Sequence, residues 1–487
     1  MRQAGILNAI SSLPGTYGVG DFGVDAYKFI DLIHDNGIRL WQILPLHPLG
    51  YGDSPYQPYS SYAGDEIYIS INGLVELGLI NKQDINDKPI INDRSDFDTC
   101  RTIKNKYLKL AYINHKTNIE IIEEFNNFKK GIIWLDSYSK FITLKKKNDG
   151  TSWTDWPTKE KEYITNPYVL SDELNDNIEY EKFVQYIFYK QWLSLKKYAN
   201  DKGIQIMGDM PIYVGLDSSD VYEDRKSFLL DDDGRPTYIA GVPPDFFSKD
   251  GQRWGNPIYD WEYLKKNKFT FWINRLKWAN QIYDITRIDH FRAFDTYWKI
   301  PVTCPTAREG EWIEAPGYEL FDTIYKEIPD IKIVAEDLGD LRKEVIELRD
   351  YYNLSGMKII QFTLDPNENN NNFKEKKNTI VYSGTHDNST VKGWFKTQRL
   401  IDKFKLKRQL KKYHGDNVIQ KINDLCVSSD ADLVILPTQD ILEYDDYARM
   451  NIPGTIGGAN WKFKLKSIAE LQTKITNYKD LIKKYNR

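Results

Sequence analysis

DITRIDHF (residues 284–291) begins as a short β-type run and ends in a cluster of charged side chains. Seven other runs have this form, in which polar or small residues close a stretch rich in apolar residues: AGILNAI (4–10), RLWQILPL (39–46), IQIMGDMPI (204–212), IKIVAEDL (331–338), MKIIQFTL (357–364), TIVYSGT (379–385) and DLVILPTQ (432–439). Several are almost continuously apolar, as expected for parallel strands covered on both faces. Eight such runs, several followed by helical patterns, predict an α/β fold, a (β/α)8 TIM barrel.

The spacing of the eight runs is uneven and predicts large, mostly helical insertions between the barrel strands. Residues 1–70 are expected to hold the first two strands, and residues 71–203 read as a mostly helical inserted subdomain because they are too long for a loop. Residues 204–487 complete the barrel, with a second insertion at about 213–283 that is rich in Gly, Pro, Asp and aromatic residues. The Asn-rich run 367–377 is expected to form a surface loop in place of a helix.

Two helical stripes support the barrel assignment. After the first strand, VDAYKFIDLIHDNG places Ala26, Phe29, Ile30 and Ile33 on one face, with Gly37 positioned to end the helix. Near the C-terminus, apolar residues recur at helical spacing and predict a stripe that packs against the barrel: Ile468, Leu471, Ile475, Tyr478, Ile482 and Tyr485.

Composition excludes several classes of partner and location. A net charge of -4 gives no electrostatic reason to expect nucleic acid or an anionic membrane as partner. Three separated Cys residues argue against a disulfide framework, and no apolar stretch approaches the roughly 18 residues of a membrane span. The first residues, MRQAGILNAISS, lack the apolar core of a signal peptide, so a cytoplasmic location is expected. The aromatic content of 14% suits both a packed core and a carbohydrate site, where sugar rings stack on aromatic faces.

Charged residues gather at the ends of the predicted strands. Catalytic side chains of TIM barrels come from the C-terminal ends of strands, so these residues are expected to meet in one place. The third predicted strand ends in Asp209, and the fourth ends in Arg287, Asp289 and His290. The fifth ends in Glu336, the seventh in His386 and Asp387, and the eighth in Asp440. Buried carboxylates are costly unless they are paired or functional, so the concentration of acid predicts a reactive site.

The pattern favours chemistry at a glycosidic bond. Arg287 and Asp289 are two residues apart on a strand and share a face, so the guanidinium favours the ionised form that a nucleophile needs. Anionic neighbours should hold the proton of Glu336 more tightly, which suits a general acid. Asp387, which follows His386, is a candidate for holding sugar hydroxyl groups or for stabilising a developing oxocarbenium charge. A retaining mechanism requires two carboxylates about 5–5.5 Å apart, a distance that the sequence does not give.

No cofactor or metal is expected. Gly18, Gly20 and Gly23 spell G-x-G-x-x-G, but the strand ends several residues earlier and no acidic residue closes the next strand, so a dinucleotide site is rejected. No H-E-x-x-H or comparable spacing supports a metal site. Acid, base and nucleophile suffice for the predicted chemistry.

The motifs resemble those of one known family. In chain order they are SSLPGTYGVGDFG, GYGDSPYQPYSSYAGDE, MGDMPIYV, AGVPPDFFSKDGQRWGNPIYDW, RIDHFRAF, VAEDLG, SGTHDNSTVKGW and NIPGT with a following NW. This set resembles the amylomaltases, the 4-α-glucanotransferases of glycoside hydrolase family 77, from residue 4 to about residue 461. The family often has Trp and Arg where this chain has Phe463 and Lys464, and it commonly has a Pro-His-Asn run that is missing before the seventh strand here.

The resemblance implies that Asp289 is the nucleophile, Glu336 the acid/base and Asp387 a third carboxylate that holds the substrate. It also implies that residues 241–257 cover the site and that Tyr51 marks a second glucan site at the rim. Further residues are implied beside the cleaved bond or in contact with sugars: Asp209, Arg287, His290, His386, Tyr56, Trp254 and Asn460. The implied substrates are maltooligosaccharides and α-1,4-glucans, with glucose as acceptor, and the implied state is a monomer or weak homo-oligomer.

Two alternatives remain at this stage. A plain α-glucan hydrolase would use the same fold and the same carboxylates. A non-catalytic glycan-binding protein would use the barrel without turnover, but the presence of all three acidic residues argues against it.

Overall fold

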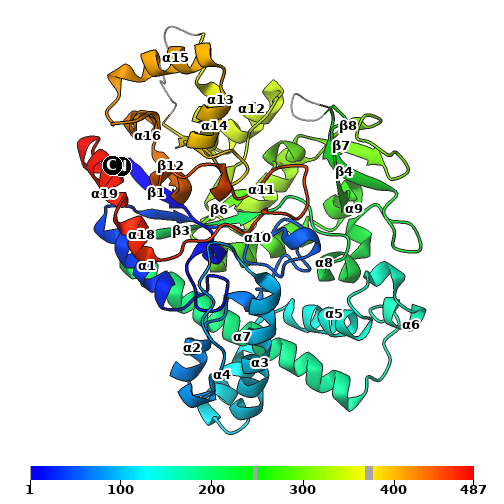
Figure 1. The fold of residues 1–487 in the computed structure, drawn as a ribbon. Helices are drawn as coiled ribbons and strands as arrows, with labels where there is room; N and C mark the ends of the chain where they lie inside the picture. The colour runs from blue at the N-terminus through cyan, green and yellow to red at the C-terminus, as the bar shows by residue number, and fades with distance from the viewer. Residues whose placement is uncertain (1, 245–248, 368–376) are drawn as a thin grey trace.

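Eight parallel strands form the centre of the molecule. The computed structural model describes residues 2–244, 249–367 and 377–487. Hydrogen-bonded neighbours follow the order β10-β11-β12-β1-β2-β3-β6-β9. The strands are β1 (Gln3–Leu7), β2 (Leu40–Gln42), β3 (Gln205–Met210), β6 (Ile285–Ile288), β9 (Ile333–Ala335), β10 (Gly356–Ile359), β11 (Thr379–Tyr382) and β12 (Leu433–Pro437). Each lies within or beside one of the eight predicted runs, and the TIM-barrel prediction is confirmed (Figure 1).

The two end strands of this order meet and close the barrel. Val334 of β9 forms a parallel bridge with Ser355, and the Ala335 N–H donates to the Ser355 carbonyl at 2.9 Å. Asp337 reinforces the seam, because its Oδ1 accepts a hydrogen bond from the N–H of Met357 on β10 at 2.7 Å. The carboxyl ends of all eight strands therefore surround one end of a closed barrel.

Strand β3 packs so closely against Tyr283 that position 208 has room only for glycine. The ring of Tyr283 lies so near Gly208 that a Cβ at this position would come within 2.2 Å of ring carbon atoms. The residue after Gly208 is Asp209, which pairs with Arg287 in the register of β3 and β6. The tight packing of the ring against β3 thus fixes the strand that carries Asp209.

The segment between β2 and β3 is mainly helical and lies on one side of the barrel (Figure 1). The longest helix, α7, has 30 residues and leads directly into β3. No helix in the described ranges combines the length and apolar composition that a membrane crossing requires. The helices of this segment are α2 (Ile71–Glu76), α3 (Phe97–His115), α4 (Ile119–Gly131), α5 (Leu135–Lys147), α6 (Thr158–Lys161) and α7 (Asp172–Asp201).

The remaining helices follow the barrel strands. The predicted face of α1 is confirmed, since Ala26, Phe29, Ile30 and Ile33 are buried. The hydroxyl of Tyr478 on α19 donates to the Gly5 carbonyl of β1 at 2.8 Å, as expected for a C-terminal segment that packs on the barrel. The helices are α1 (Val24–Asp35), α8 (Ser219–Glu223), α9 (Trp261–Lys266), α10 (Thr270–Ile282), α11 (Gly317–Glu327), α12 (Lys343–Tyr351), α13 (Ile360–Thr363), α14 (Val391–Thr397), α15 (Leu400–Gln409), α16 (Val418–Ser428), α17 (Thr438–Ile441), α18 (Ile468–Gln472) and α19 (Ile475–Lys484).

A second sheet was not predicted. Four antiparallel strands pair in the order β5-β4-β7-β8, where β4 is Tyr238–Val242, β5 is Gln252–Pro257, β7 is Thr296–Pro301 and β8 is Glu311–Glu314. The segment 241–257, expected as a covering loop, is therefore largely a hairpin of β4 and β5, of which residues 245–248 lie outside the described residues. Most of the Asn-rich run, predicted as a surface loop, also lies outside them.

Candidate active site

Arg287 links two carboxylates at the ends of β3 and β6. Its Nη1 donates to both oxygens of Asp209 at 2.7 Å, and its Nη2 donates to Oδ1 of Asp289 at 2.9 Å. Asp209 is fully buried and Arg287 nearly so, whereas the side chain of Asp289 is 29% exposed. The buried Asp209–Arg287 pair thus fixes a guanidinium that orients Asp289 while leaving that carboxylate within reach of solvent.

Glu336 is held by two backbone donors at the end of β9. Its Oε2 accepts from the His290 N–H at 2.7 Å, and its Oε1 accepts from the Leu338 N–H at 3.0 Å. His290 has φ 51° and ψ 49°, a left-handed conformation that is uncommon for residues other than glycine. This conformation directs the His290 N–H to Glu336, and because His290 follows Asp289, the two carboxylates are brought together. The structure therefore unites two acids that are 47 positions apart in the sequence.

The two carboxyl groups bind their protons with different strength. Burial raises the pKa of Asp289 to about 6, although Arg287 opposes the increase. Burial, followed by the negative charge of Asp289, raises the pKa of Glu336 to about 8. At neutral pH Asp289 is mostly ionised and Glu336 mostly protonated. One group is then suited to nucleophilic attack and the other to proton donation.

We expect a bell-shaped dependence of kcat/KM on pH. The rate should fall below about pH 6, where Asp289 becomes protonated, and above about pH 8, where Glu336 loses its proton. Because the groups interact, the two limbs report apparent pKa values of the pair. Initial rates on maltotriose, with circular dichroism recorded at each pH as a control for unfolding, would give the profile. A rate that keeps rising well above pH 8 with the fold intact would contradict the protonated state of Glu336.

Asp387 lies beside an aromatic and imidazole cluster. The Tyr56 hydroxyl donates to Oδ2 of Asp209 at 2.7 Å and lies 2.9 Å from Nε2 of His386. The two rings are stacked, with centroids 5.3 Å apart and planes inclined by 15°. Nε2 of His386 is also 3.4 Å from Oδ2 of Asp387, whose side chain is 42% exposed. Tyr56 and His386 thus connect the Asp209–Arg287 pair to the third carboxylate.

Trp254 brings the second sheet to the same site. Its indole meets the His290 ring edge to face, with centroids 4.8 Å apart. Gln57, the neighbour of Tyr56, donates to the Trp254 carbonyl at 3.2 Å and to Oδ1 of Asn256 at 2.8 Å. Strand β5 is therefore attached to the barrel loops that carry the candidate catalytic residues.

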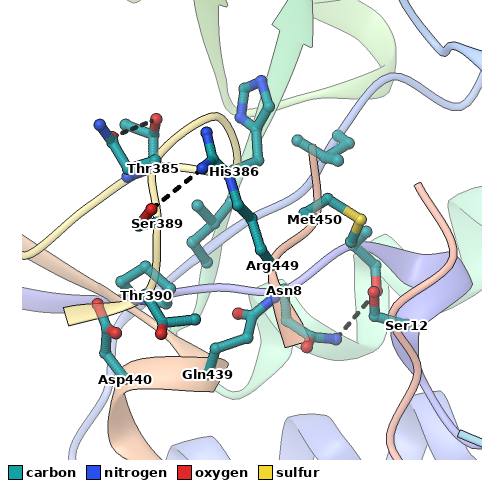
Figure 2. Close-up of a pocket in the computed structure, with 15 residues that line it drawn as sticks. Asn8, Ser12, Thr385, His386, Ser389, Thr390, Gln439, Asp440, Arg449 and Met450 are labelled. Atoms are coloured by element: carbon teal, nitrogen blue, oxygen red, sulfur yellow. Dashed lines mark hydrogen bonds between the residues drawn. The ribbon is translucent and has the colours of Figure 1, made fainter. Parts of the chain in front are cut away.

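Two residues that support Asp387 were not predicted. Asn451 donates from Nδ2 to Oδ1 of Asp387 at 2.6 Å, and its N–H donates to the His386 carbonyl at 3.0 Å. Arg449 donates from Nη2 to the Asp387 carbonyl at 2.6 Å. It also donates from Nη1 to Oγ of Ser389 at 3.0 Å (Figure 2). Asn451 begins the NIPGT motif, so the motif marked the residue without revealing its role.

Asn451→Ala is expected to lower kcat about tenfold or more, because a hydrogen bond to a charged carboxylate is worth about 1.5–3 kcal/mol. Asn451→Asp keeps the size of the side chain but replaces the donor by a second carboxylate, so it should be the more damaging change. Steady-state kinetics on maltotriose would rank the variants, and thermal melting would show whether they fold. Wild-type kcat in Asn451→Asp would contradict a role in positioning Asp387.

Two other predicted residues, Asp440 and Asn460, form their side-chain hydrogen bonds with residues outside the carboxylate cluster. Asp440 is buried and accepts hydrogen bonds from Oγ of Ser383 at 2.5 Å and from the Val391 N–H at 2.8 Å, so it ties two barrel segments together. The amide of Asn460 bonds within its own loop, to the Ile452 N–H at 3.1 Å and the Thr455 carbonyl at 3.1 Å. Tyr51 begins a 3-10 helix (Tyr51–Asp53), and its side chain lies outside the described part of the chain.

A small pocket lies behind the segment that carries His386. Figure 2 shows Arg449 reaching across it toward Ser389, with Asn8 and Gln439 on the barrel side. Its lining includes several residues of the 385–390 segment but neither Asp289 nor Glu336. Among the described residues, no group of three or more His, Cys, Asp or Glu side chains is arranged to hold a metal ion.

Comparison with known proteins gives one family. Residues 8–471 match glycoside hydrolase family 77, described as 4-alpha-glucanotransferase. The chain is 41% identical over 474 residues to a 4-alpha-glucanotransferase of Streptococcus pneumoniae, covering 95% of this chain and 93% of that protein. It is 40% identical over 481 residues to a 4-alpha-glucanotransferase of Thermus thermophilus, covering 95% of both chains.

Solved structures agree with the sequence relatives. An amylomaltase from Streptococcus agalactiae, in complex with acarbose, has a TM-score of 0.94 and 35% identity, with all of both chains covered. An amylomaltase from Corynebacterium glutamicum, 17% identical, shares the fold with a TM-score of 0.80 over 99% of this chain and 75% of its own. The chain therefore belongs to glycoside hydrolase family 77, the family of the 4-alpha-glucanotransferases or amylomaltases.

Proposed function

We propose that the protein transfers segments of α-1,4-glucan to the 4-hydroxyl of glucose or another glucan by a retaining double displacement. The observation that carries the proposal is the pair formed by Asp289 and Glu336. The pKa of Asp289 is about 6 and that of Glu336 is about 8. The two residues are linked by His290, which follows Asp289 in the chain and donates its N–H to the Glu336 carboxyl group. A retaining mechanism needs one ionised and one protonated carboxyl group beside the same bond.

In the first step, Asp289 attacks the anomeric carbon and Glu336 protonates the oxygen of the leaving glucan. The C–O bond to the leaving glucan breaks as the bond to the Asp289 carboxylate forms. In the second step, Glu336 takes the proton of an acceptor 4-hydroxyl, and the acceptor oxygen displaces Asp289 from the anomeric carbon. The product keeps the α configuration because two inversions occur.

The surrounding residues supply binding and charge control. Arg287 opposes protonation of Asp289, since its positive charge lowers the pKa that burial raises. We assign Asp387, His386 and Tyr56 to contacts with the sugar that is attacked, and Trp254 and His290 to contacts with the neighbouring sugar. Asp209 is fully buried, so we assign it to holding Arg287 and Tyr56 in position. Contacts of Asn460 with sugar, and a second glucan site at Tyr51, stay predictions. Action in the cytoplasm as a monomer or weak homo-oligomer is part of the proposal.

The alternative is a hydrolase that gives the intermediate to water. Transfer requires that an acceptor glucan outcompete water at the covalent intermediate, and the hairpin of β4 and β5, which places Trp254 against His290, is the element that would limit water.

Incubation with maltotriose separates the alternatives. We expect glucose together with a ladder of longer oligosaccharides, resolved by chromatography. Products no longer than maltotriose would indicate hydrolysis, and bound but unchanged maltotriose would indicate a glycan-binding protein.

A further inference from the structure

Trp312 exposes its indole to solvent although large aromatic residues are usually buried. It lies on β8, at the edge of the antiparallel sheet. All 13 Trp residues are in the described ranges, and Trp312 is the most exposed of them at 39%. The exposed part of this indole is a flat apolar surface that a ligand could contact.

The ring of Trp312 is held in place by two neighbours. The guanidinium of Arg292 lies over one face, 4.0 Å from the ring centroid. Trp298, its direct partner in the register of β7 and β8, meets the ring at 62° with centroids 5.1 Å apart. Trp298 is fixed in turn, because its Nε1 donates to the Ala307 carbonyl at 2.9 Å. A ligand that stacked on Trp312 would therefore meet a preorganised surface and lose little affinity to ordering it.

Arg292 connects this surface to both catalytic segments. It lies in the 3-10 helix Phe291–Phe294, three residues after Asp289. Its Nη1 donates to the carbonyl of Asp340 at 2.8 Å, in the loop that follows Glu336. The positive charge of Arg292 also contributes, after burial, to the lowered pKa of His290. The side chain of Arg292 thus lies between the indole of Trp312 and the two segments that carry Asp289 and Glu336, and it also contacts the loop after Glu336.

We propose that Trp312 and Arg292 form a subsite for the acceptor glucan, at a distance of more than one glucose unit from the reacting carbon. The inference rests on the proposed function, in which Glu336 faces the leaving and incoming glucans. An α-1,4-glucan offers flat C–H faces to the indole and hydroxyl groups to the guanidinium. On this proposal, glucose as acceptor does not contact the subsite, whereas a longer acceptor such as maltotetraose does.

The test compares two acceptors at a fixed, saturating concentration of α-maltosyl fluoride as donor. Trp312→Ala should raise the KM for maltotetraose about tenfold, the size expected for loss of one stacking contact, and leave the KM for glucose unchanged. Trp312→Phe retains a flat ring and should lie between wild type and Trp312→Ala. Tyr351→Ala is the matched control, since Tyr351 is an aromatic residue of α12 that is 70% exposed and is expected to change neither KM.

An unchanged KM for maltotetraose in Trp312→Ala would overturn the subsite. An equal rise for both acceptors would also overturn it, because that result indicates a general disturbance through Arg292 and His290. Absence of any transfer product from the wild-type enzyme would refute the proposed function itself, so the two failures are distinguishable.

Discussion

Asp289→Asn is expected to lower the rate of maltotriose disproportionation by a factor on the order of 10⁴ to 10⁶, as seen when a residue essential to covalent catalysis is removed. The amide has nearly the same shape as the carboxylate and can still accept a hydrogen bond from Arg287, which lies 2.9 Å from Oδ1. The variant should therefore fold and bind maltooligosaccharides with an affinity close to that of the wild type. Steady-state rates and calorimetric titration with maltotriose would measure the two effects separately.

Asp440→Asn is the matched control for Asp289→Asn. Asp440 also follows a barrel strand and is buried, and burial raises its pKa to about 6, as it does for Asp289. Its carboxylate accepts hydrogen bonds from Ser383 and Val391, neither of which is a candidate catalytic residue. We expect some loss of stability in this variant but turnover close to wild type for the folded fraction. Comparable losses of turnover in both variants would contradict the role of Asp289 as nucleophile.

The barrel could be predicted because its strands are buried on both faces. Every residue of β12, for example, is buried, and this burial requires the continuous apolar run LVILP. The antiparallel sheet lacks that signal, since three of the four residues of β8 are exposed and β5 consists of QRWGNP with few apolar residues. Such strands are stabilised by pairing with β4 and β7, and the sequence of one strand does not reveal its partner.

The candidate site, like the fold, could be predicted only in part. The acids Asp289, Glu336 and Asp387 could be located because they follow predicted strands, and parallel strands of a barrel direct their carboxyl ends to one face. Arg449 and Asn451 could not be located, because they lie more than 60 positions after Asp387 in the sequence. Only folding of the chain brings them into contact with Asp387. The conformation of His290, which aims its N–H at Glu336, is likewise a backbone feature that residue identity did not indicate.

Glu336→Gln should reduce turnover of maltotriose by about 10²–10⁴-fold, the usual contribution of a general acid. An α-maltosyl fluoride donor should restore much of the first step, because fluoride leaves with little need for a proton. Asp289→Asn should gain nothing from the fluoride, since it lacks the nucleophile. The amide can replace only one of the two oxygens that accept from His290 and Leu338, so thermal melting is needed to confirm that the variant is folded.

Glu336→Ala with added azide gives a stereochemical test of the same assignment. The variant has no base to activate an acceptor hydroxyl, but azide is already anionic and can displace Asp289 from the covalent intermediate formed with α-maltosyl fluoride. Because the intermediate is itself inverted, attack by azide should give the α-maltosyl azide, which nuclear magnetic resonance distinguishes from the β form. In Asp289→Ala, by contrast, azide would occupy the space of the missing carboxylate and give the β-azide by direct displacement. The opposite pattern of anomers would reverse the roles assigned to Asp289 and Glu336, and formation of the same anomer in both variants would exclude a double displacement through Asp289.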